Sequence, residues 1–238
     1  MTNANSLNGV SPETGLVYED LPRLMTLMTG DEKHSFSATS TLDVLWVLYS
    51  RVLKIDPGNP ENPARDRFLL SKGHGPMAYY AVLAARGFIP VDTLPTFAQY
   101  DSILGKHPDG QLVPGVEIGS GSLGHGLPIA TGVANGLRAR GSGSKVFCLV
   151  GDAESGEGSG FEAIAMAGRL KLSNLTAIVI DNKSDSNGWP GGISSRFAVE
   201  GWSTADVDGR DQGAIYEALV TPHSDRPHVV VTSVEPDA

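Results

Sequence analysis

Cysteine is almost absent from this chain of 238 residues, which contains only Cys148. A single thiol excludes a framework of intramolecular disulfides. Cys148 lies within the apolar run KVFCLV, and free cysteines in apolar strands are usually buried. We therefore expect Cys148 to be a structural thiol in the core.

Basic residues are also few. The chain has 18 lysines and arginines against 27 aspartates and glutamates, which gives a net charge of −9. This balance argues against a surface that binds nucleic acid or anionic membranes. The sequence also lacks a long apolar run and a basic-plus-apolar leader. We expect a cytoplasmic protein without a nucleic-acid or membrane partner, and its length is sufficient for one large α/β domain.

The most informative stretch that is present runs from Lys145 to Asn182. Two short apolar runs, KVFCLV and LTAIVID, are typical of buried parallel strands. Between them, four residues recur at helical spacing, namely Phe161, Ile164, Ala165 and Gly168. Strand, helix and strand predict one βαβ unit, whose crossover returns the chain to the same edge of the sheet.

Two oxygen-bearing side chains follow these two strands. Asp152 comes just after the first and Asn182 just after the second, so both lie where open α/β sheets bind ligands. One carboxylate and one amide oxygen suit Mg²⁺, which completes its coordination with water and substrate phosphates. Gly151, Gly156 and Gly158 allow a phosphate to approach the backbone, and the following helix offers its N-terminal amides. These residues predict a diphosphate held through a divalent metal.

Other elements are predicted from local patterns. Ser40-Thr-Leu-Asp43 is typical of a capping box for a helix that continues to Leu53. Short strands are expected at FLLS, before Gly73, and at HVVVTSV. The segments IDPGNPENPARD and KSDSNGWPGG are typical of loops. Further helices are expected over residues 21–28, 76–86, 121–140 and 212–220.

The stretch GDAESGEG…EAIAMAGRLKLSNLTAIVIDN closely resembles the thiamine-diphosphate motif in its transketolase form. The resemblance extends from about residue 34 to about residue 211 and includes DRFLLSKGHG, KHPDG, PGVEIGSGSLGHG and GWSTADVDGRD. Its order and length are similar to the N-terminal subunit of a split transketolase. The resemblance implies a three-layer α/β/α fold with a mostly parallel sheet and helices on both faces. We expect an N-terminal arm over residues 1–31 and a thiamine-diphosphate-binding domain over 32–238.

The resemblance also implies the ligands of two cofactors, thiamine diphosphate and Mg²⁺. The backbone at Gly121, Ser122 and Leu123 would lie against the pyrimidine ring of thiamine diphosphate. The rest of that cofactor would be bound by His74, Gly151, Asp152, Ala153 and Asn182. The metal ligands would be Asp152, Asn182 and Ser184.

Three histidines are implied as catalytic residues, and imidazole suits their roles because its pKa lies near neutrality. His74 would contact the diphosphate and the hydroxyls of the sugar. His107 would hold the terminal hydroxyl and the carbonyl oxygen of the donor. His34 would move protons on the acceptor side.

The acidic residues of the motif are assigned separately. Glu157 is implied as a further catalytic residue, which relays protons between paired active sites at the subunit interface. Glu154 and Glu162 are expected to be surface or interface residues. Ala153 replaces the usual glycine, and this change is tolerable because only the N–H group of that residue is needed.

The activity implied is transfer of a two-carbon ketol unit from a ketose or ketose phosphate to an aldehyde acceptor. In this family the glutamate that activates the cofactor lies on a pyrimidine-binding domain, and no such domain exists in these 238 residues. We therefore expect activity only with a partner subunit that carries the pyrimidine and C-terminal domains. The expected assembly is a heterotetramer with two copies of each subunit (α₂β₂).

Alternative interpretations remain open. Gly119-Ser-Gly-Ser-Leu-Gly124 matches the dinucleotide motif G-x-G-x-x-G, but it follows no strand and lacks the acidic residue about twenty positions later. The same glycines could serve only packing at the start of a helix. The α subunit of a 2-oxoacid dehydrogenase shares the Gly-Asp…Asn motif but lacks the set of three histidines. A non-catalytic subunit that stabilises or regulates a partner is the last alternative.

Overall fold

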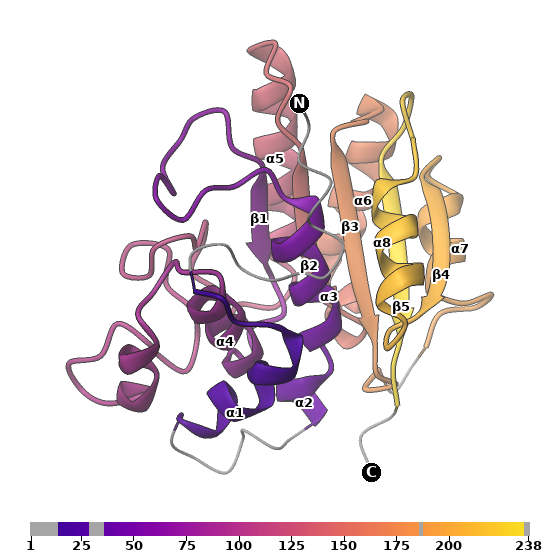
Figure 1. The fold of residues 1–238 in the computed structure, drawn as a ribbon. Helices are drawn as coiled ribbons and strands as arrows, with labels where there is room; N and C mark the ends of the chain where they lie inside the picture. Colours follow the sequence, from indigo (N-terminus) through magenta and orange to yellow (C-terminus); the bar gives the residue numbers. More distant parts are fainter. Residues whose placement is uncertain (1–13, 29–35, 186–187, 236–238) are drawn as a thin grey trace.

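The computed structural model describes residues 14–28, 36–185 and 188–235, which form a parallel sheet covered by helices (Figure 1). The sheet has five strands in the order β1-β2-β3-β5-β4, and every neighbouring pair is parallel. The strands are β1 (Arg67–Leu70), β2 (Val146–Gly151), β3 (Leu175–Asp181), β4 (Ser203–Asp208) and β5 (His228–Ser233). The predicted βαβ unit is confirmed by β2, the helix α6 (Gly158–Leu170) and β3.

Helices cover both faces of this sheet, which confirms the predicted three-layer fold. One core contains residues of α1 (Leu21–Thr26), α3 (Leu42–Val47), α4 (Met77–Ala85) and α8 (Gln212–Val220). The other contains residues of α5 (Gly126–Ala139), α6 and α7 (Ile193–Ala198). Successive side chains of a strand point to opposite faces, so Phe147 of β2 belongs to the first core and Cys148 to the second. Cys148 is fully buried, as expected, and burial raises the pKa of its thiol.

Short helical turns occupy several connections. They are the 3₁₀ turns η1 (Tyr18–Asp20), η4 (Val91–Thr96) and η5 (Ala153–Gly156), the four-residue helix α2 (Phe36–Thr39) and the π-helical turn η3 (Leu48–Val52). The apolar patch predicted as a short helix corresponds to α1, which packs against α4. Among the described residues, no helix is long and apolar enough to cross a membrane.

Helix α3 begins one residue later than the predicted capping box at Ser40 to Asp43 requires. Helix α3 begins after Thr41, which makes no capping hydrogen bond through its side chain. The carboxylate of Asp43 instead accepts hydrogen bonds from Arg210 at 3.1 Å and from Gln212 at 2.9 Å. The Asp43 carboxylate thus belongs to a tertiary polar network. Past Val47 the helix continues as a π-helical turn rather than as α-helix.

The helix predicted over residues 121–140 starts five residues later than expected, at Gly126. Gly121 and Gly124 have φ values of +123° and +77°, which are incompatible with a right-handed helix. These residues form a loop at the carboxyl edge of the sheet. The sequence pattern did not predict β4 or α7, whereas α4, α8 and β5 lie where they were expected.

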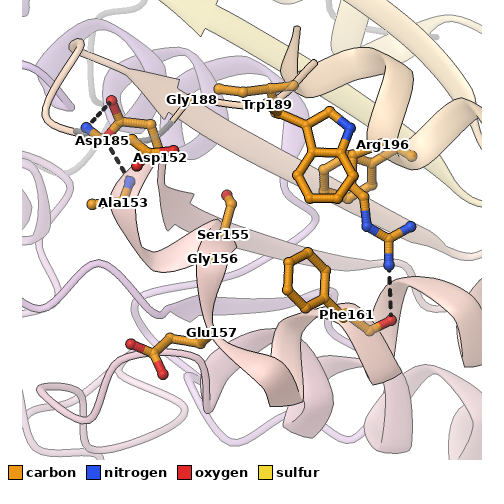
Figure 2. Close-up of a pocket in the computed structure, with 12 residues that line it drawn as sticks. Asp152, Ala153, Ser155, Gly156, Glu157, Phe161, Asp185, Gly188, Trp189 and Arg196 are labelled. Atoms are coloured by element: carbon orange, nitrogen blue, oxygen red, sulfur yellow. Dashed lines mark hydrogen bonds between the residues drawn. The ribbon is translucent and has the colours of Figure 1, made fainter. Parts of the chain in front are cut away.

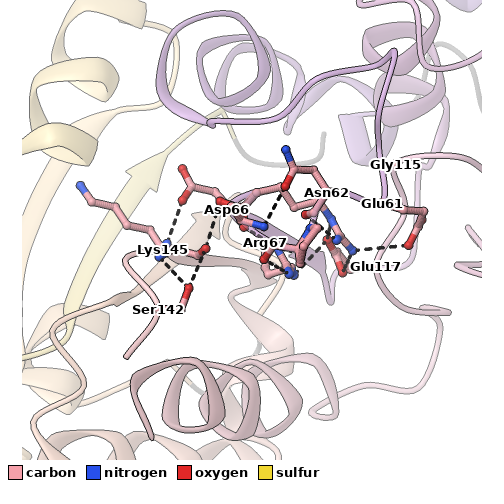
Figure 3. A network of polar contacts seen from close by, with 12 residues as sticks. Glu61, Asn62, Asp66, Arg67, Gly115, Glu117, Ser142 and Lys145 are labelled. Carbon is pink, nitrogen blue, oxygen red and sulfur yellow. Dashed lines mark hydrogen bonds and ion pairs between the residues drawn. The ribbon is translucent and has the colours of Figure 1, made fainter. Parts of the chain in front are cut away.

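A polar network at the amino end of β1 and β2 fastens the segments that lead to this edge (Figure 3). Glu117 accepts hydrogen bonds from Arg65 at 2.9 and 3.1 Å and lies 3.8 Å from Arg67. Asp66, between the two arginines, accepts a hydrogen bond of 2.8 Å from the backbone amide of Lys145. The segment that carries Glu117 is therefore anchored to the start of the sheet before it enters the loop at residues 119–126.

Candidate functional site

The carboxylate of Asp152 is buried at the carboxyl end of β2, beside the end of β3. The strands are in register there, since the amide of Asp152 donates to the carbonyl of Ile180 at 3.0 Å. Oδ1 of Asp152 accepts from the amide of Ala153 at 2.8 Å and from the hydroxyl of Ser184. Its Oδ2 accepts from the amides of Ser184 at 2.7 Å and Asp185 at 3.2 Å. The predicted convergence of two strand ends is present.

Asn182 is also buried, with an exposed fraction of 2 %. Its Oδ1 has no hydrogen-bond partner among the described residues. A buried amide oxygen without a partner is costly, and a bound cation would satisfy it. No group of three or more histidine, cysteine, aspartate or glutamate side chains converges in the described part of the chain. The donor set of one carboxylate, one amide and one hydroxyl therefore fits a hard cation that prefers oxygen ligands, rather than zinc.

His74 and His107 come together from two segments far apart in the sequence. Their ring centroids are 5.9 Å apart, with the rings edge to face, and both side chains are exposed. Glycines make this approach possible. A Cβ on Gly73 would lie 2.8 Å from the backbone of Gly121, and a Cβ on Gly121 would lie 2.9 Å from the His107 ring. The loop that contains Gly121 is thus packed directly against His107, with Ser122 and Leu123 exposed beside it.

A cavity of about 400 Å³ extends from Asp152 toward α7 (Figure 2). The far wall is formed by Phe161, Trp189 and Arg196, which lie across the cavity from Asp152 and Ala153. The Phe161 and Trp189 rings are 5.5 Å apart, and the Arg196 guanidinium lies 4.8 and 5.4 Å from their centroids. The sequence pattern did not predict this wall. The segment KSDSNGWPGG, which contains Trp189, was expected only to form a loop.

Glu157 also lines this cavity, and its side chain is exposed. A Cβ on Gly124 would lie 2.5 Å from the Cβ of Glu157, so Glu157 is adjacent to the loop at 119–126. His34, the third predicted histidine, lies outside the described residues. The structure therefore brings together Asp152, Ala153 and Ser184 as one group and His74, His107 and Gly121 as another.

The prediction that Glu154 is a surface or interface residue is wrong. Its exposed fraction is 4 %, and its carboxylate accepts hydrogen bonds from Gly124 at 2.9 Å, from Gly151 at 3.2 Å and from the hydroxyl of Ser71. The 3₁₀ turn η5 is the reason, because it directs Glu154 back beneath the end of the sheet. Glu162, on α6, is exposed as expected.

Comparisons with known proteins identify the family of this chain. The family model described as transketolase, thiamine diphosphate binding domain, matches residues 26–234. An apulose-4-phosphate transketolase subunit from Actinobacillus succinogenes is 39 % identical over 208 residues, which is 84 % of this chain and 75 % of that protein. Ferredoxin fas2 of Rhodococcoides fascians is 54 % identical over 222 residues, which is 93 % of this chain and 73 % of that protein. Ferredoxin clusters are held by cysteine thiolates, typically four, and the single cysteine here cannot supply them.

Solved transketolases share the fold. A mutant of Pichia stipitis transketolase in complex with fructose 6-phosphate superposes with a TM-score of 0.78 at 25 % identity, over 91 % of this chain and 36 % of that one. The Campylobacter jejuni transketolase gives a TM-score of 0.75 at 25 % identity, over 91 % and 37 %. This chain thus spans about a third of the length of these enzymes. It belongs to the transketolase family, as an N-terminal subunit of the transketolase type that carries the thiamine-diphosphate-binding domain.

Proposed function

We propose that this chain is the N-terminal subunit of a two-subunit thiamine-diphosphate-dependent transketolase. The pair would transfer a two-carbon ketol unit from a ketose or ketose phosphate to an aldehyde acceptor. The single observation that supports this most is that the buried Asp152 and Asn182 follow the carboxyl ends of β2 and β3, while His74, which is paired with His107, follows the same end of the parallel strand β1.

Asp152, Asn182 and Ser184 would hold Mg²⁺. The orphaned Oδ1 of Asn182 supports this assignment, since the cation would supply its missing partner. The backbone at Gly151 and Ala153 would lie beside the diphosphate. Thiamine diphosphate, when bound, supplies the nucleophilic carbon that takes up the two-carbon unit and stabilises the negative charge left by carbon–carbon cleavage.

The loop that contains Gly121, Ser122 and Leu123 would lie against the pyrimidine ring at the other end of the cofactor. His74 and His107 are exposed at the same edge, so they can donate hydrogen bonds to the hydroxyl and carbonyl oxygens of the donor sugar. His34 would be the third group that moves protons, on the acceptor side.

A separate partner subunit would supply the pyrimidine and C-terminal domains. Three relatives are named as transketolase subunits rather than as whole enzymes. Glu157 is exposed and borders both the cavity and the 119–126 loop. It would therefore meet the partner and relay protons across the interface in an α₂β₂ assembly.

The test is to purify this chain together with the C-terminal transketolase subunit of the same organism. Ketose cleavage with an aldehyde acceptor is then measured with and without Mg²⁺ and thiamine diphosphate. We expect activity that requires both chains and is abolished by Asp152→Ala. Decarboxylation of pyruvate without ketose cleavage would instead indicate a 2-oxoacid dehydrogenase, and no turnover with intact cofactor binding would indicate a scaffold.

A further inference from the structure

The carboxylate of Glu154 joins three segments at the carboxyl edge of the sheet. Its Oε2 accepts from the amide of Gly151 at the end of β2. Its Oε1 accepts from the amide of Gly124 and from the hydroxyl of Ser71, just after β1. Ser71 in turn accepts a hydrogen bond of 3.0 Å from the amide of Gly126. A single buried side chain thus connects β1, β2 and the 119–126 loop.

The loop at residues 119–126 is tightly packed around the Glu154 carboxylate. The carbonyl of Gly124 accepts from the hydroxyl of Ser159 at 2.8 Å, so both backbone polar groups of Gly124 are held. Gly124 has a φ of +77°, and a Cβ there would lie 2.5 Å from Glu157. A Cβ on Gly126 would lie 2.2 Å from that of Ser71. If the hydrogen bonds of Glu154 were lost, these close contacts would hinder the loop from moving to a new position that compensates for them.

The chemistry of the contact requires a carboxylate. All three partners of Glu154 donate, and an ionised carboxylate is a side chain that only accepts. Hydrogen bonds to an ionised acceptor are about twice as strong as those between neutral groups. A glutamine of the same shape would turn its NH₂ group toward at least one of these donors and leave that donor unsatisfied.

We propose that Glu154 is a positioning residue, which fixes the loop at Gly121 to Leu123 relative to the Asp152 turn. This inference rests on the proposed function, in which the loop meets the pyrimidine ring and the turn meets the diphosphate. Glu154 would set the spacing between the two ends of the bound cofactor without touching either. A purely structural role would change stability but would not separate the binding of the two ends.

The experiment compares two ligands on the purified pair of subunits. Thiamine diphosphate probes both ends of the site, whereas inorganic pyrophosphate probes only the Asp152 end, and each is titrated calorimetrically in the presence of Mg²⁺. For Glu154→Gln we expect the Kd of thiamine diphosphate to rise by about tenfold or more, and that of pyrophosphate by less than about threefold. Glu162→Gln, at an exposed glutamate on α6, should leave both constants unchanged.

Ser71→Ala is the second variant, because it removes only the link from Glu154 to Gly126. It should also raise the Kd of thiamine diphosphate more than that of pyrophosphate, but by a smaller factor. If Glu154→Gln does not fold, this variant provides the test. An unchanged ratio in the variants that fold would overturn this inference alone. If the unmodified pair bound no thiamine diphosphate, the proposed function and this inference would both be overturned.

Discussion

The backbone amide of Ser184 lies 2.7 Å from Oδ2 of Asp152, so the turn after β3 is fastened to the end of β2. The hydroxyl of Ser184 and the amide of Asp185 donate to the same carboxylate. Oδ1 of Asn182, by contrast, has no partner among the described residues. Asp152 therefore stabilises the turn without any ligand, whereas the Asn182 oxygen gains a partner only when something binds.

The first prediction concerns these two residues. Asp152→Ala should destabilise the metal-free pair of subunits by about 1–3 kcal/mol, because the turn after β3 loses its hydrogen bonds to a charged acceptor. Asn182→Ala should cost less in the absence of metal, because no hydrogen bond to Oδ1 is lost. Both variants should abolish the rise in unfolding temperature that Mg²⁺ and thiamine diphosphate produce. The unfolding temperature is measured by thermal denaturation with and without both ligands. If the Asn182→Ala variant, purified with its partner subunit, keeps the full increase, Asn182 is not a metal ligand.

We expect two neighbouring histidines, His107 and His125, to differ in their contribution to activity. His107→Ala should lower kcat/KM for ketol transfer by about 10²–10⁴, the usual contribution of a group that transfers protons in catalysis. The Kd of thiamine diphosphate should stay within about threefold, a change of less than 1 kcal/mol. His125→Ala is the matched control, since His125 is exposed nearby and has no proposed role. Equal losses of activity in the two variants would contradict the assignment of His107.

The βαβ unit and the positions of Asp152 and Asn182 after its two strands could be predicted because periodicity and strand order suffice for that purpose. β2 and β3 are apolar on both faces, and a crossover of fixed hand returns the chain to the same edge. The edge strand β4 was missed. Its side chains are half-buried or exposed, so it contributes no continuous apolar run.

Glu154 could not be placed from the sequence for a different reason. A 3₁₀ turn and an α-helical start orient the same residue differently, and GDAESGEG does not distinguish between them. The direction of Glu154 depends on donors from Ser71 and Gly124, which are 83 and 30 positions away. The wall formed by Trp189 and Arg196 likewise depends on α7 folding back against α6. Such contacts between distant segments have no local signature.

The third prediction concerns the anchor of the 119–126 loop. Glu117→Ala should destabilise the protein by about 1–3 kcal/mol, because Arg65 and Arg67, each of whose side chains is nearly buried, lose their shared carboxylate. Glu61→Ala removes a carboxylate that also faces Arg65, but at 4.0 Å and with 86 % of its side chain exposed. That control should change stability by less than about 0.5 kcal/mol. Chemical denaturation of the two variants measures both effects, and similar losses would refute the anchoring role.

The fourth prediction concerns pH and rests on a pair of stacked histidines at the amino end of the sheet. The His228 ring is buried, 5.1 Å from that of His223, and its nitrogens lie 3.1 Å from the carbonyl oxygens of Ser203 and Ala218. Hydrogen bonds to the two carbonyl groups raise the pKa of the His228 ring, but the loss of hydration on burial lowers it by more. Burial therefore lowers the pKa of His228, and the neighbouring His223 lowers it further. Burial also lowers the pKa of His223.

A lowered pKa in the folded state gives the pH dependence a definite sign. The unfolded chain has histidine pKa values of about 6.5, so below that pH it binds more protons than the folded chain. Stability should be fully present above about pH 6.5 and should fall as the pH decreases toward the lowered folded values. His223→Ala should reduce the fall in unfolding temperature between about pH 7 and 5.5, because one of the two depressed groups is removed. His125→Ala, at an exposed ring, should retain the full dependence, and a His223→Ala curve that coincides with it would contradict the role of the buried pair.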